Sequence, residues 1–235
     1  MFLHKKEDSE YFRYQGRKIS KRLSPSYLNL LKENYDKYSF DEEILSLYKL
    51  NNKKKFLRIS NNRFKKTNIE IGFGDGEYLL KSAISRPDEL FIGSEVYING
   101  IAKVLRQIIN LEINNIKLSK LNCIYLLKVI QPKSIDMITI INPDPWLKKR
   151  HHKRRLISCE NIRVLTNLTK SKNSILITTD SEGYVQYIKN IFSNNNNLSC
   201  NLNLIVLEEN NNLYGVSRYQ RKALREGKKI YLLTI

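Results

Sequence analysis

The residues Asn68-Ile69-Glu70-Ile71-Gly72-Phe73-Gly74-Asp75-Gly76-Glu77 set the architecture of the chain, because a short apolar strand passes through three glycines into a predicted helix at 77–85. Glycines in such a turn let the backbone approach a ligand that side chains would block. The dinucleotide-binding pattern places its third glycine one residue later, where a pyrophosphate packs on the helix N-terminus. Here Asp75 and Glu77 would repel a pyrophosphate, so the turn predicts a Rossmann-like site for a different ligand.

Strands and helices alternate along the chain after this turn. The apolar pattern predicts strands at 68–71, 90–95, 116–121, 135–141, 174–179, 202–207 and 229–234. It predicts helices at 77–85, 98–111, 156–168 and 184–192. This alternation indicates an α/β fold with a seven-stranded, mainly parallel sheet and helices on both faces.

The residues before the first predicted strand form a separate region. We divide the chain into a basic N-terminal arm at 1–67 and a main domain at 68–235. The arm contains a predicted short amphipathic helix at 26–38 and a linker at 51–55. An arm that helps to hold RNA and a mobile solvated tail explain this region equally well.

The charge balance favours a polyanionic partner. The 235 residues include 41 Lys and Arg against 23 Asp and Glu, a formal net charge of +18, which is more than solubility requires and favours nucleic acid. The cysteines Cys123, Cys159 and Cys200 have neither metal-ligand nor disulfide-framework spacing, so we expect reduced thiols in a cytoplasmic protein and no metal. No apolar run approaches the ~20 residues that cross a bilayer, so no membrane association is expected.

Polar residues stand where the second and third predicted strands end. Glu95 ends the strand at 90–95, about 20 residues after the glycine turn, where Rossmann-like sites hold ribose hydroxyls with an acid. The alternative is a solvated glutamate at a strand end, which the glycine turn makes the less favoured interpretation. Asn122 follows the strand at 116–121, and its amide oxygen can accept a hydrogen bond.

The strand at 135–141 leads into Pro143-Asp144-Pro145-Trp146 and then into a basic run at 148–155. Both prolines fix φ, so Asp144 sits on a stiff backbone at a strand end, where α/β sheets bind ligands. The basic run holds six Lys or Arg and two His. Charge runs are usually solvated faces, but the position of this one beside a fixed carboxylate favours RNA binding. Its two histidines are better explained as RNA contacts than as metal ligands, because no acid or Cys has suitable spacing.

A basic and aromatic segment at 213–222 precedes the last predicted strand. It contains Ser217-Arg218-Tyr219-Gln220, and its position allows it to cover the ligand end of the sheet. Aromatic rings and guanidinium planes stack on unpaired bases, so the segment is a predicted contact to RNA. Core tyrosine next to solvated arginine is the alternative.

Together these motifs resemble the bacterial tRNA (guanine-N7-)-methyltransferase family, a group of class I S-adenosylmethionine-dependent methyltransferases with a Rossmann-like fold. The resemblance is carried by residues 69–76, 93–96, 142–156, 179–180 and 216–220, and it extends from about 13 to 231. The glycine turn alone indicates only a methyltransferase, whereas the stretch 143–156 is specific to the family.

The resemblance implies a role for each motif. It implies transfer of a methyl group from S-adenosylmethionine to N7 of a variable-loop guanine in tRNA, which gives 7-methylguanosine. The implied cofactor-binding residues are Glu70, Gly72, Gly74, Glu95, Asn122 and Asp144. The implied substrate contacts are Lys148, Asp180, Ser217, Arg218, Tyr219 and Gln220. The implied RNA contacts are Arg150, His151, His152, Lys153, Arg154 and Arg155.

Two positions differ from the family pattern. The family commonly has Asp where Asn122 stands and Glu where Gln220 stands. Both residues keep an acceptor and lose a charge. If Gln220 accepts hydrogen bonds from guanine, Gln220→Glu should keep activity or raise it modestly, because a charged acceptor binds more strongly.

The chemistry implied by the resemblance assigns distinct tasks to two acids. Guanine N7 carries an in-plane lone pair and no proton at neutral pH, so positioning and exclusion of water matter more than a general base. Asp144 is the predicted catalytic residue, because a carboxylate favours the positive charge that spreads over guanine in the transition state. Asp180 can accept hydrogen bonds from guanine N1 and N2, which would select guanine over adenine.

Two other functions stay open at the level of sequence. One is methylation of another RNA position, such as an exocyclic amine, and the other is a catalytically inactive RNA-binding protein with the same fold. Cofactor binding separates the inactive protein from both enzymes, and mapping of the methylated atom separates the enzymes. We expect tRNA as partner, no obligate protein partner, and a monomer or homodimer.

Overall fold

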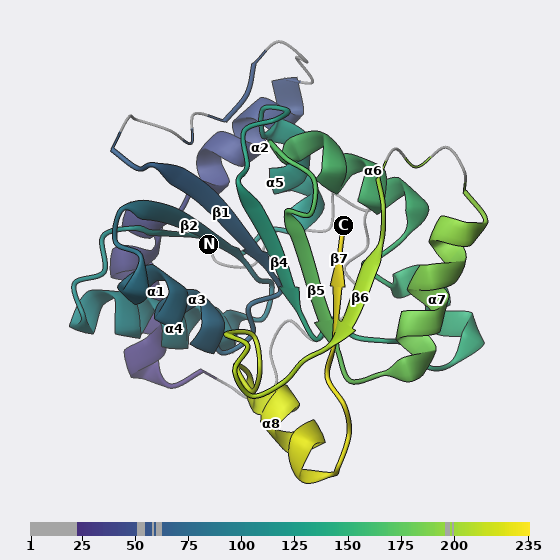
Figure 1. Ribbon diagram of the computed structural model, residues 1–235. Coiled ribbons are helices and arrows are strands. Elements are labelled where there is room, and N and C mark those ends of the chain that lie inside the picture. The colour runs from purple at the N-terminus through teal and green to yellow at the C-terminus, as the bar shows by residue number, and fades with distance from the viewer. Residues whose placement is uncertain (1–22, 51–54, 58, 60–62, 196–197, 199) are drawn as a thin grey trace.

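The computed structural model describes residues 23–50, 55–57, 59, 63–195, 198 and 200–235. Within these ranges seven strands form one sheet in the order β3-β2-β1-β4-β5-β7-β6 (Figure 1). The strands are β1 (Lys66–Ile71), β2 (Glu89–Ser94), β3 (Ile116–Ser119), β4 (Met137–Ile141), β5 (Ile175–Thr179), β6 (Asn203–Val206) and β7 (Tyr231–Thr234). β7 runs antiparallel to both of its neighbours, and the other pairs are parallel. The predicted seven-stranded, mainly parallel sheet is therefore confirmed.

Helices cover both faces of the sheet. They are α1 (Pro25–Asn34), α2 (Asp41–Leu50), α3 (Glu77–Ser85), α4 (Ile98–Asn110), α5 (Cys123–Val129), α6 (Cys159–Leu168), α7 (Glu182–Ser193) and α8 (Arg218–Arg225). α1, α3 and α4 pack on one face around Leu105 and Leu118, while α2, α5, α6 and α7 pack on the other around Ile138 and Ile177 (Figure 1). Because both faces are covered, β2 is buried at every position.

The carboxyl ends of β1, β2, β4 and β5 meet at one edge of the sheet, because these strands are parallel. The chain leaves β1 for β2 on one side and later returns to β4 on the other, an arrangement that opens a crevice for a ligand. α8 lies at this edge (Figure 1), where Val216 and Ala223 pack in one apolar cluster with Ile141 and Leu232. The glycine turn, the end of β2 and the loop after β4 therefore open onto the same place.

The sequence pattern does not predict three of these helices, α2, α5 and α8. α5 is a seven-residue segment that is mostly apolar, and periodicity cannot separate such a segment from a strand. α8 is almost wholly polar, and only Gln220 and Ala223 within it are buried, so its apolar stripe is too narrow to notice. The predicted helix at 26–38 is present as α1 followed by the 3₁₀ turn η1 (Tyr35–Tyr38).

The described part of the predicted N-terminal arm is joined to the sheet by a buried hydrogen-bond network. The hydroxyl of Tyr35 donates to Oδ2 of Asp41 at 2.8 Å, and both residues are buried. Oδ1 of Asp41 accepts from the hydroxyl of Ser119 at 2.6 Å. The backbone N–H of Lys120 donates to the hydroxyl of Tyr35 at 2.7 Å. These bonds fix the start of η1 and the start of α2 against the end of β3.

The predicted boundary between residues 67 and 68 falls inside β1, which begins at Lys66. Leu31 and Ile44, from the arm, belong to the same apolar cores as the sheet. Residues 1–22 of the predicted arm and 51–54 of the predicted linker lie outside the described residues. The described helices of the arm are thus part of the fold of the main domain.

Asp41→Ala is expected to lower the free energy of unfolding by about 1–3 kcal/mol, because the hydroxyls of Tyr35 and Ser119 would lose a buried acceptor. Urea unfolding followed by circular dichroism measures this difference. Asp36→Ala is the matched control, since Asp36 is an exposed acid in η1 and should change stability by no more than about 0.5 kcal/mol. Equal effects of the two substitutions would contradict the role of the network.

Candidate functional site

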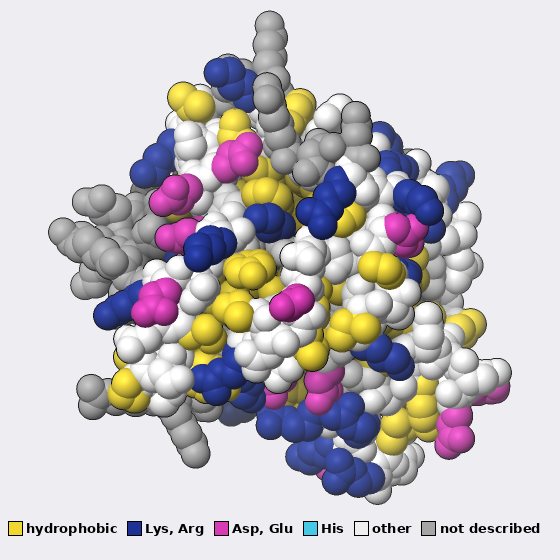
Figure 2. Space-filling model, turned by 90° about the vertical axis from the view of Figure 1, so that its left-hand side faces the viewer, with side chains coloured by type: hydrophobic (Ala, Val, Ile, Leu, Met, Phe, Trp, Pro, Cys, Tyr) yellow, Lys and Arg dark blue, Asp and Glu magenta, His cyan; other side chains and the backbone are white. Residues whose placement is uncertain are grey.

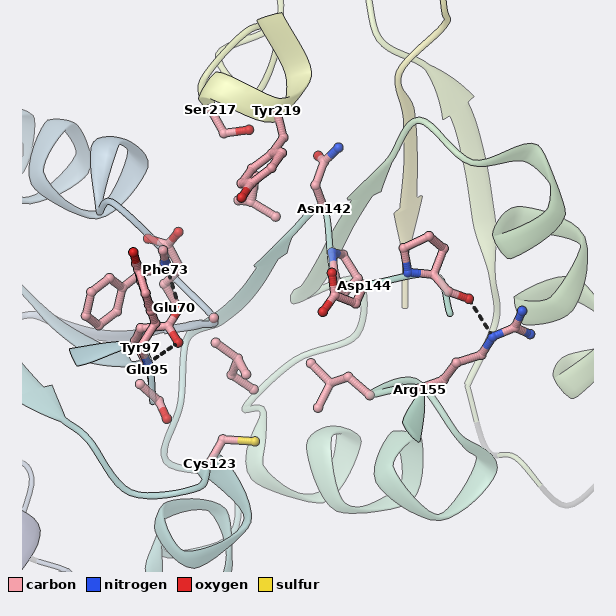
Figure 3. Close-up of a pocket in the computed structure, with 18 of the residues that line it drawn as sticks. Glu70, Phe73, Glu95, Tyr97, Cys123, Asn142, Asp144, Arg155, Ser217 and Tyr219 are labelled. Carbon is pink, nitrogen blue, oxygen red and sulfur yellow. Dashed lines mark hydrogen bonds between the residues drawn. The ribbon is translucent and has the colours of Figure 1, made fainter. Parts of the chain in front are cut away.

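A cavity of about 1850 Å³ opens at the carboxyl edge of the sheet. Its walls are formed by the glycine turn, the ends of β2 and β4, and the starts of α5 and α8 (Figure 3). Most of the predicted site residues line it, namely Glu70, Gly72, Gly74, Glu95, Asn122, Asp144, His152, Lys153, Arg154, Arg155, Asp180, Ser217, Arg218 and Tyr219. The predicted residues that do not line it are Lys148, Arg150, His151 and Gln220.

The glycine turn presents open backbone to the cavity. Gly72, Gly74 and Gly76 have φ values of 74°, 57° and 74°, in the left-handed region that favours glycine. A Cβ atom on Gly72 or Gly74 would meet no atom within 4 Å, so the space beside both residues is free for a ligand. A Cβ atom on Gly76 would clash with the side chain of Val104, so this glycine is required by the packing of α3 against α4.

Glu70 is a buried carboxyl group in the cavity wall. Only 4% of its surface is exposed, and its Oε2 has no hydrogen-bond partner among the described residues. Burial, and to a lesser degree the charge of Glu95, raise its pKa from 4.5 to about 8. The group is therefore largely protonated at neutral pH, and a cationic ligand group beside it would favour its ionised form.

Glu95 organises the backbone around the cavity. Its Oε2 accepts from the N–H of Gly74 at 2.8 Å, and its Oε1 accepts from the N–H groups of Val96 and Tyr97 at 2.7 and 2.9 Å (Figure 3). One carboxylate thus ties the glycine turn to the end of β2. Because a carboxylate has about four acceptor positions, Oε2 retains capacity for a ligand hydroxyl.

Asn122 is the N-cap of α5, and its Oδ1 accepts from the backbone N–H of Ile124 at 3.2 Å. Asparagine is a preferred residue at this position, so the residue type also has a structural explanation. The thiol of Cys123 also donates to this oxygen, with Sγ 3.8 Å away. Cys123, which the sequence does not mark as a site residue, lines the cavity beside it. Burial raises the pKa of the Cys123 thiol to about 12, so the thiol is uncharged at neutral pH.

The loop after β4 holds Asp144 between two residues in left-handed conformations. Asn142 has φ 48° and Trp146 has φ 45°, and for a tryptophan this conformation is rare unless the surroundings impose it. Arg155 provides part of that constraint, because its Nε donates to the carbonyl of Pro145 at 2.8 Å (Figure 3). Asp144 lines the cavity, and partial burial raises the pKa of its carboxyl group.

The basic run contains the 3₁₀ helix η2 (Lys149–Arg154) and divides into exposed and anchored side chains. The exposed ones are Lys148, Lys149, Arg150 and Lys153. Arg154 lies 5.0 Å from the ring centroid of Trp146. Arg155 is 9% exposed and lies 4.1 Å from the ring centroid of Tyr187. The predicted RNA contact at Arg155 does not fit this buried position, because its guanidinium is used to hold the Asp144 loop.

α8 brings Tyr219 to the cavity and keeps Gln220 away from it. Ser217 caps the helix by accepting from the N–H of Gln220 at 3.2 Å. Tyr219 is 64% exposed and reaches from α8 into the cavity (Figure 3). Gln220 is fully buried, where its Oε1 accepts from the N–H of Val216 and its Nε2 donates to the hydroxyl of Thr178, both at 3.0 Å. The predicted guanine contact at Gln220 does not fit, because both ends of the amide are used inside the protein.

Two connections around the cavity have no signal in the sequence. Arg221 of α8 donates to both carboxylate oxygens of Glu77 at 2.7 and 3.0 Å, which ties α8 to the start of α3. The hydroxyl of Thr178, at the end of β5, donates to Oδ1 of Asn142 at 3.0 Å. A threonine in a strand also fits ordinary β-propensity, so no pattern marks Thr178 as a site residue.

Among the described residues, no three His, Cys, Asp or Glu side chains lie together as possible metal ligands. None of the described helices combines the length and the apolar composition that crossing a membrane requires.

Known proteins are similar to this chain in sequence and in fold. Residues 65–233 match the family model described as "Putative methyltransferase". The chain is 33% identical over 189 residues to the tRNA (guanine-N(7)-)-methyltransferase of Wolbachia pipientis wMel, covering 80% of this chain and 83% of the relative. It is 34% identical over 212 residues to the bifunctional methyltransferase of Rickettsia prowazekii (strain Madrid E), covering 90% of this chain. It spans 37–39% of the length of three such bifunctional Rickettsia relatives.

The solved structure of the 16S rRNA methyltransferase KamB has the same fold, with a TM-score of 0.53 at 12% identity, and covers 83% of this chain and 93% of its own. The sheet order and the KamB structure define a Rossmann-like class I fold, and the family model defines the class as a methyltransferase. Within that class, the family model and the Wolbachia relative place the chain in the tRNA (guanine-N7-)-methyltransferase family, to which it belongs.

Proposed function

We propose that this chain transfers a methyl group from S-adenosylmethionine to N7 of a guanine in tRNA, which gives 7-methylguanosine. The observation that carries the proposal is one cavity that joins the glycine turn and the carboxyl groups of Glu70 and Glu95 to the clamped Asp144 and a basic rim. Membership of the family supports the reaction class, and the name of the Wolbachia relative supports the target atom.

The glycine-turn end of the cavity fits S-adenosylmethionine. When bound, this molecule supplies a methyl group on a positively charged sulfur. Glu70 offers a buried carboxyl oxygen that lacks a partner among the described residues, and this oxygen suits a positively charged ligand. Glu95 retains acceptor capacity for ribose. We assign Asn122, which lines the same end of the cavity, to the adenine amino group. Gly74 leaves the space beside the turn free.

The residues around Asp144 suit a guanine whose N7 is the nucleophile. N7 needs no general base, so the chain has to hold the ring and exclude water. We assign Asp144 to the stabilisation of the positive charge that develops on guanine, because its carboxylate lines the cavity on a backbone held by two prolines. We assign Asp180, which lines the same cavity, to the N1 and N2 donors of guanine. Adenine lacks both donors, so Asp180 would discriminate against it.

Two elements supply basic side chains around the cavity, as tRNA binding requires. η2 contributes Lys153 and Arg154 to the lining, and α8 with the turn after it contributes Arg218, Lys222 and Lys228. Figure 2 shows Lys and Arg side chains gathered at the α8 end of the molecule. A-form RNA hides N7 in a deep and narrow groove, so a loop guanine in folded tRNA suits this rim best. We also infer that the enzyme acts in the cytoplasm as a monomer or homodimer.

The proposal is tested by incubating the protein with methyl-labelled S-adenosylmethionine and unmodified tRNA. Label is expected in tRNA, and it should be absent from a transcript whose target guanosine is replaced by adenosine. Binding of S-adenosylmethionine and of tRNA without transfer would instead favour the inactive RNA-binding protein.

Affinity for tRNA is expected to fall steeply with salt, and the exposed residues of the basic run should contribute to that slope. Each lost phosphate contact flattens the log–log slope by about 0.7–0.9, so Arg150→Ala with Lys153→Ala should flatten it by up to about 1.4–1.8. Filter-binding titrations in increasing salt measure the slope. Lys172→Ala is the control, because Lys172 is exposed in the turn before β5, at the opposite edge of the sheet. An unaltered slope in the double variant would remove the basic run from the RNA surface.

The raised pKa of Glu70 predicts a pH dependence of stability. Between the ordinary pKa of 4.5 and the folded-state pKa of about 8, the folded protein holds a proton that the unfolded chain has lost. Stability contributed by this group is therefore present below about pH 4.5 and is lost as pH rises to about 8. Glu70→Gln should remove this loss, which is on the order of a few kcal/mol. Urea unfolding of both proteins at pH 5, 7 and 9 measures it, and parallel curves would contradict the assignment.

A further inference from the structure

A chain of polar side chains connects α8 to the cavity wall. Nε2 of Gln220 donates to Oγ1 of Thr178 at 3.0 Å. Oγ1 of Thr178 donates to Oδ1 of Asn142 at 3.0 Å. Nδ2 of Asn142 donates to Oδ1 of Asp180 at 3.4 Å. Asn142 and Asp180 line the cavity, whereas Gln220 and Thr178 do not, so the chain leads from the protein interior to the site.

The direction of every bond in this chain is fixed. The backbone N–H of Val216 can only donate, so the end of the Gln220 amide that faces it must be the oxygen. Nε2 of Gln220 therefore faces Thr178, whose hydroxyl has a single proton to pass on. That proton goes to Oδ1 of Asn142, which leaves Nδ2 of Asn142 to face Asp180. A backbone donor at one end and a carboxylate acceptor at the other set the direction of the chain.

Burial prevents water from replacing these bonds at their inner end. Gln220 and Thr178 are both 0% exposed, so a group that loses its partner there stays unpaired. The backbone N–H of Asn142 also donates to the carbonyl of Thr178 at 3.0 Å, which keeps the two strand ends at a constant separation. The other oxygen of Asp180 lies 3.8 Å from Nζ of Lys228 in a half-exposed ion pair, a kind that contributes little to stability.

We propose that Gln220 is a positioning residue that orients the carboxylate of Asp180 toward guanine through Thr178 and Asn142. The proposal rests on the proposed function, which assigns the N1 and N2 donors of guanine to Asp180. Through this chain, α8 acts on substrate selection although Gln220 never reaches the cavity.

The fixed directions of these hydrogen bonds reverse the effect that the sequence alone predicts for Gln220→Glu, which was unchanged or modestly raised activity. A glutamate would still accept from Val216, but it could not donate to Thr178. The hydroxyl of Thr178 would then donate to the glutamate, and the amide of Asn142 would turn its nitrogen toward Thr178. Oδ1 of Asn142 would face Asp180, so the carboxylate would lose a donor and meet a second acceptor.

The test compares guanosine with inosine at the target position of a tRNA transcript. Inosine keeps N7 and the N1 donor and lacks only the N2 amino group. Losing one hydrogen bond to a charged acceptor costs about 10- to 100-fold in kcat/KM, which is the preference expected of the unaltered protein. A side chain that only supports the fold lowers both rates together, whereas one that orients Asp180 changes their ratio.

Thr178→Val and Thr178→Ser are the matched pair, since valine keeps the shape and removes the hydroxyl while serine keeps the hydroxyl. We expect Thr178→Val and Gln220→Glu to lower the guanosine preference at least five-fold, and Thr178→Ser to retain it. If either buried variant fails to fold by circular dichroism, Asn142→Gly replaces it, because glycine tolerates the φ of 48° and removes the amide. Asn142→Gly should lose the preference to the same degree.

Each outcome has a distinct meaning. A lower preference in Thr178→Val and Gln220→Glu, with rescue by Thr178→Ser, supports the positioning role. An unchanged ratio in folded Thr178→Val or Asn142→Gly overturns it while leaving the proposed function in place. An unaltered protein that methylates both transcripts equally overturns the contact between Asp180 and N2. An unaltered protein that methylates neither transcript overturns the proposed function itself.

Discussion

Asp144→Ala is expected to lower the rate of methyl transfer in a single turnover by about 10²–10³-fold, which is the usual effect of removing one preorganised electrostatic group. The carboxylate lies between Pro143 and Pro145, at the end of β4 and on the cavity wall. Its loop is held in place by the hydrogen bond that Arg155 donates to the carbonyl of Pro145. Because the group is fixed before substrate arrives, little reorganisation is needed when positive charge develops on guanine.

Asp144→Asn is the control for shape, because it keeps the size of the side chain and removes only the charge. The two variants should lose similar amounts of rate if charge is the cause, and both should keep the circular dichroism spectrum of the unaltered protein. A folded Asp144→Ala protein with near-normal single-turnover rate would leave Asp144 as a scaffold residue and would remove it from the mechanism.

Glu95→Ala is expected to weaken binding of S-adenosylmethionine by more than about 100-fold, because two effects combine. The variant loses the acceptor assigned to ribose. It also releases the N–H groups of Gly74, Val96 and Tyr97, which lie in the turn and at the strand end beside the cofactor region. Isothermal titration calorimetry with S-adenosylmethionine measures the affinity.

Glu95→Gln separates these two effects. A glutamine oxygen can still accept from Val96 and Tyr97, but its amide nitrogen cannot accept from Gly74. Its affinity should therefore lie between those of Glu95→Ala and the unaltered protein. Affinity for tRNA should change little in both variants, because Glu95 lies at the glycine-turn end of the cavity. An unchanged affinity of Glu95→Ala for S-adenosylmethionine would rule out the assignment.

Structural features that are determined by residues close together in the sequence could be predicted. The glycine turn carries a local signature, because residues 72, 74 and 76 all have positive φ. The strand at 137–141 and the prolines after it likewise mark a strand end with a fixed acid. Rules of α/β topology bring these strand ends to one edge, so the sequence alone predicts where the cavity lies.

Side-chain contacts between residues far apart in the sequence could not be predicted. Gln220 contacts Thr178, which lies 42 residues earlier in the chain, and the pairing depends on which side of a short polar helix faces β5. Arg155 carries the same charge as its neighbours in the basic run, and only the fold places it against Tyr187 of α7. Residue type predicted an exposed charge at Arg155 and a ligand contact at Gln220, whereas packing turned both side chains inward.

Identification of the modified nucleoside decides whether this chain is a tRNA guanine-N7 methyltransferase. The purified protein is incubated with S-adenosylmethionine and an unmodified tRNA transcript, and the tRNA is digested to nucleosides. The digest is separated by chromatography against standards of 7-, 1-, N2- and 2′-O-methylguanosine, which share one mass. We predict 7-methylguanosine as the product, with its amount reduced in Asp144→Ala. A different methylated nucleoside, or none in a preparation that binds S-adenosylmethionine, would contradict it.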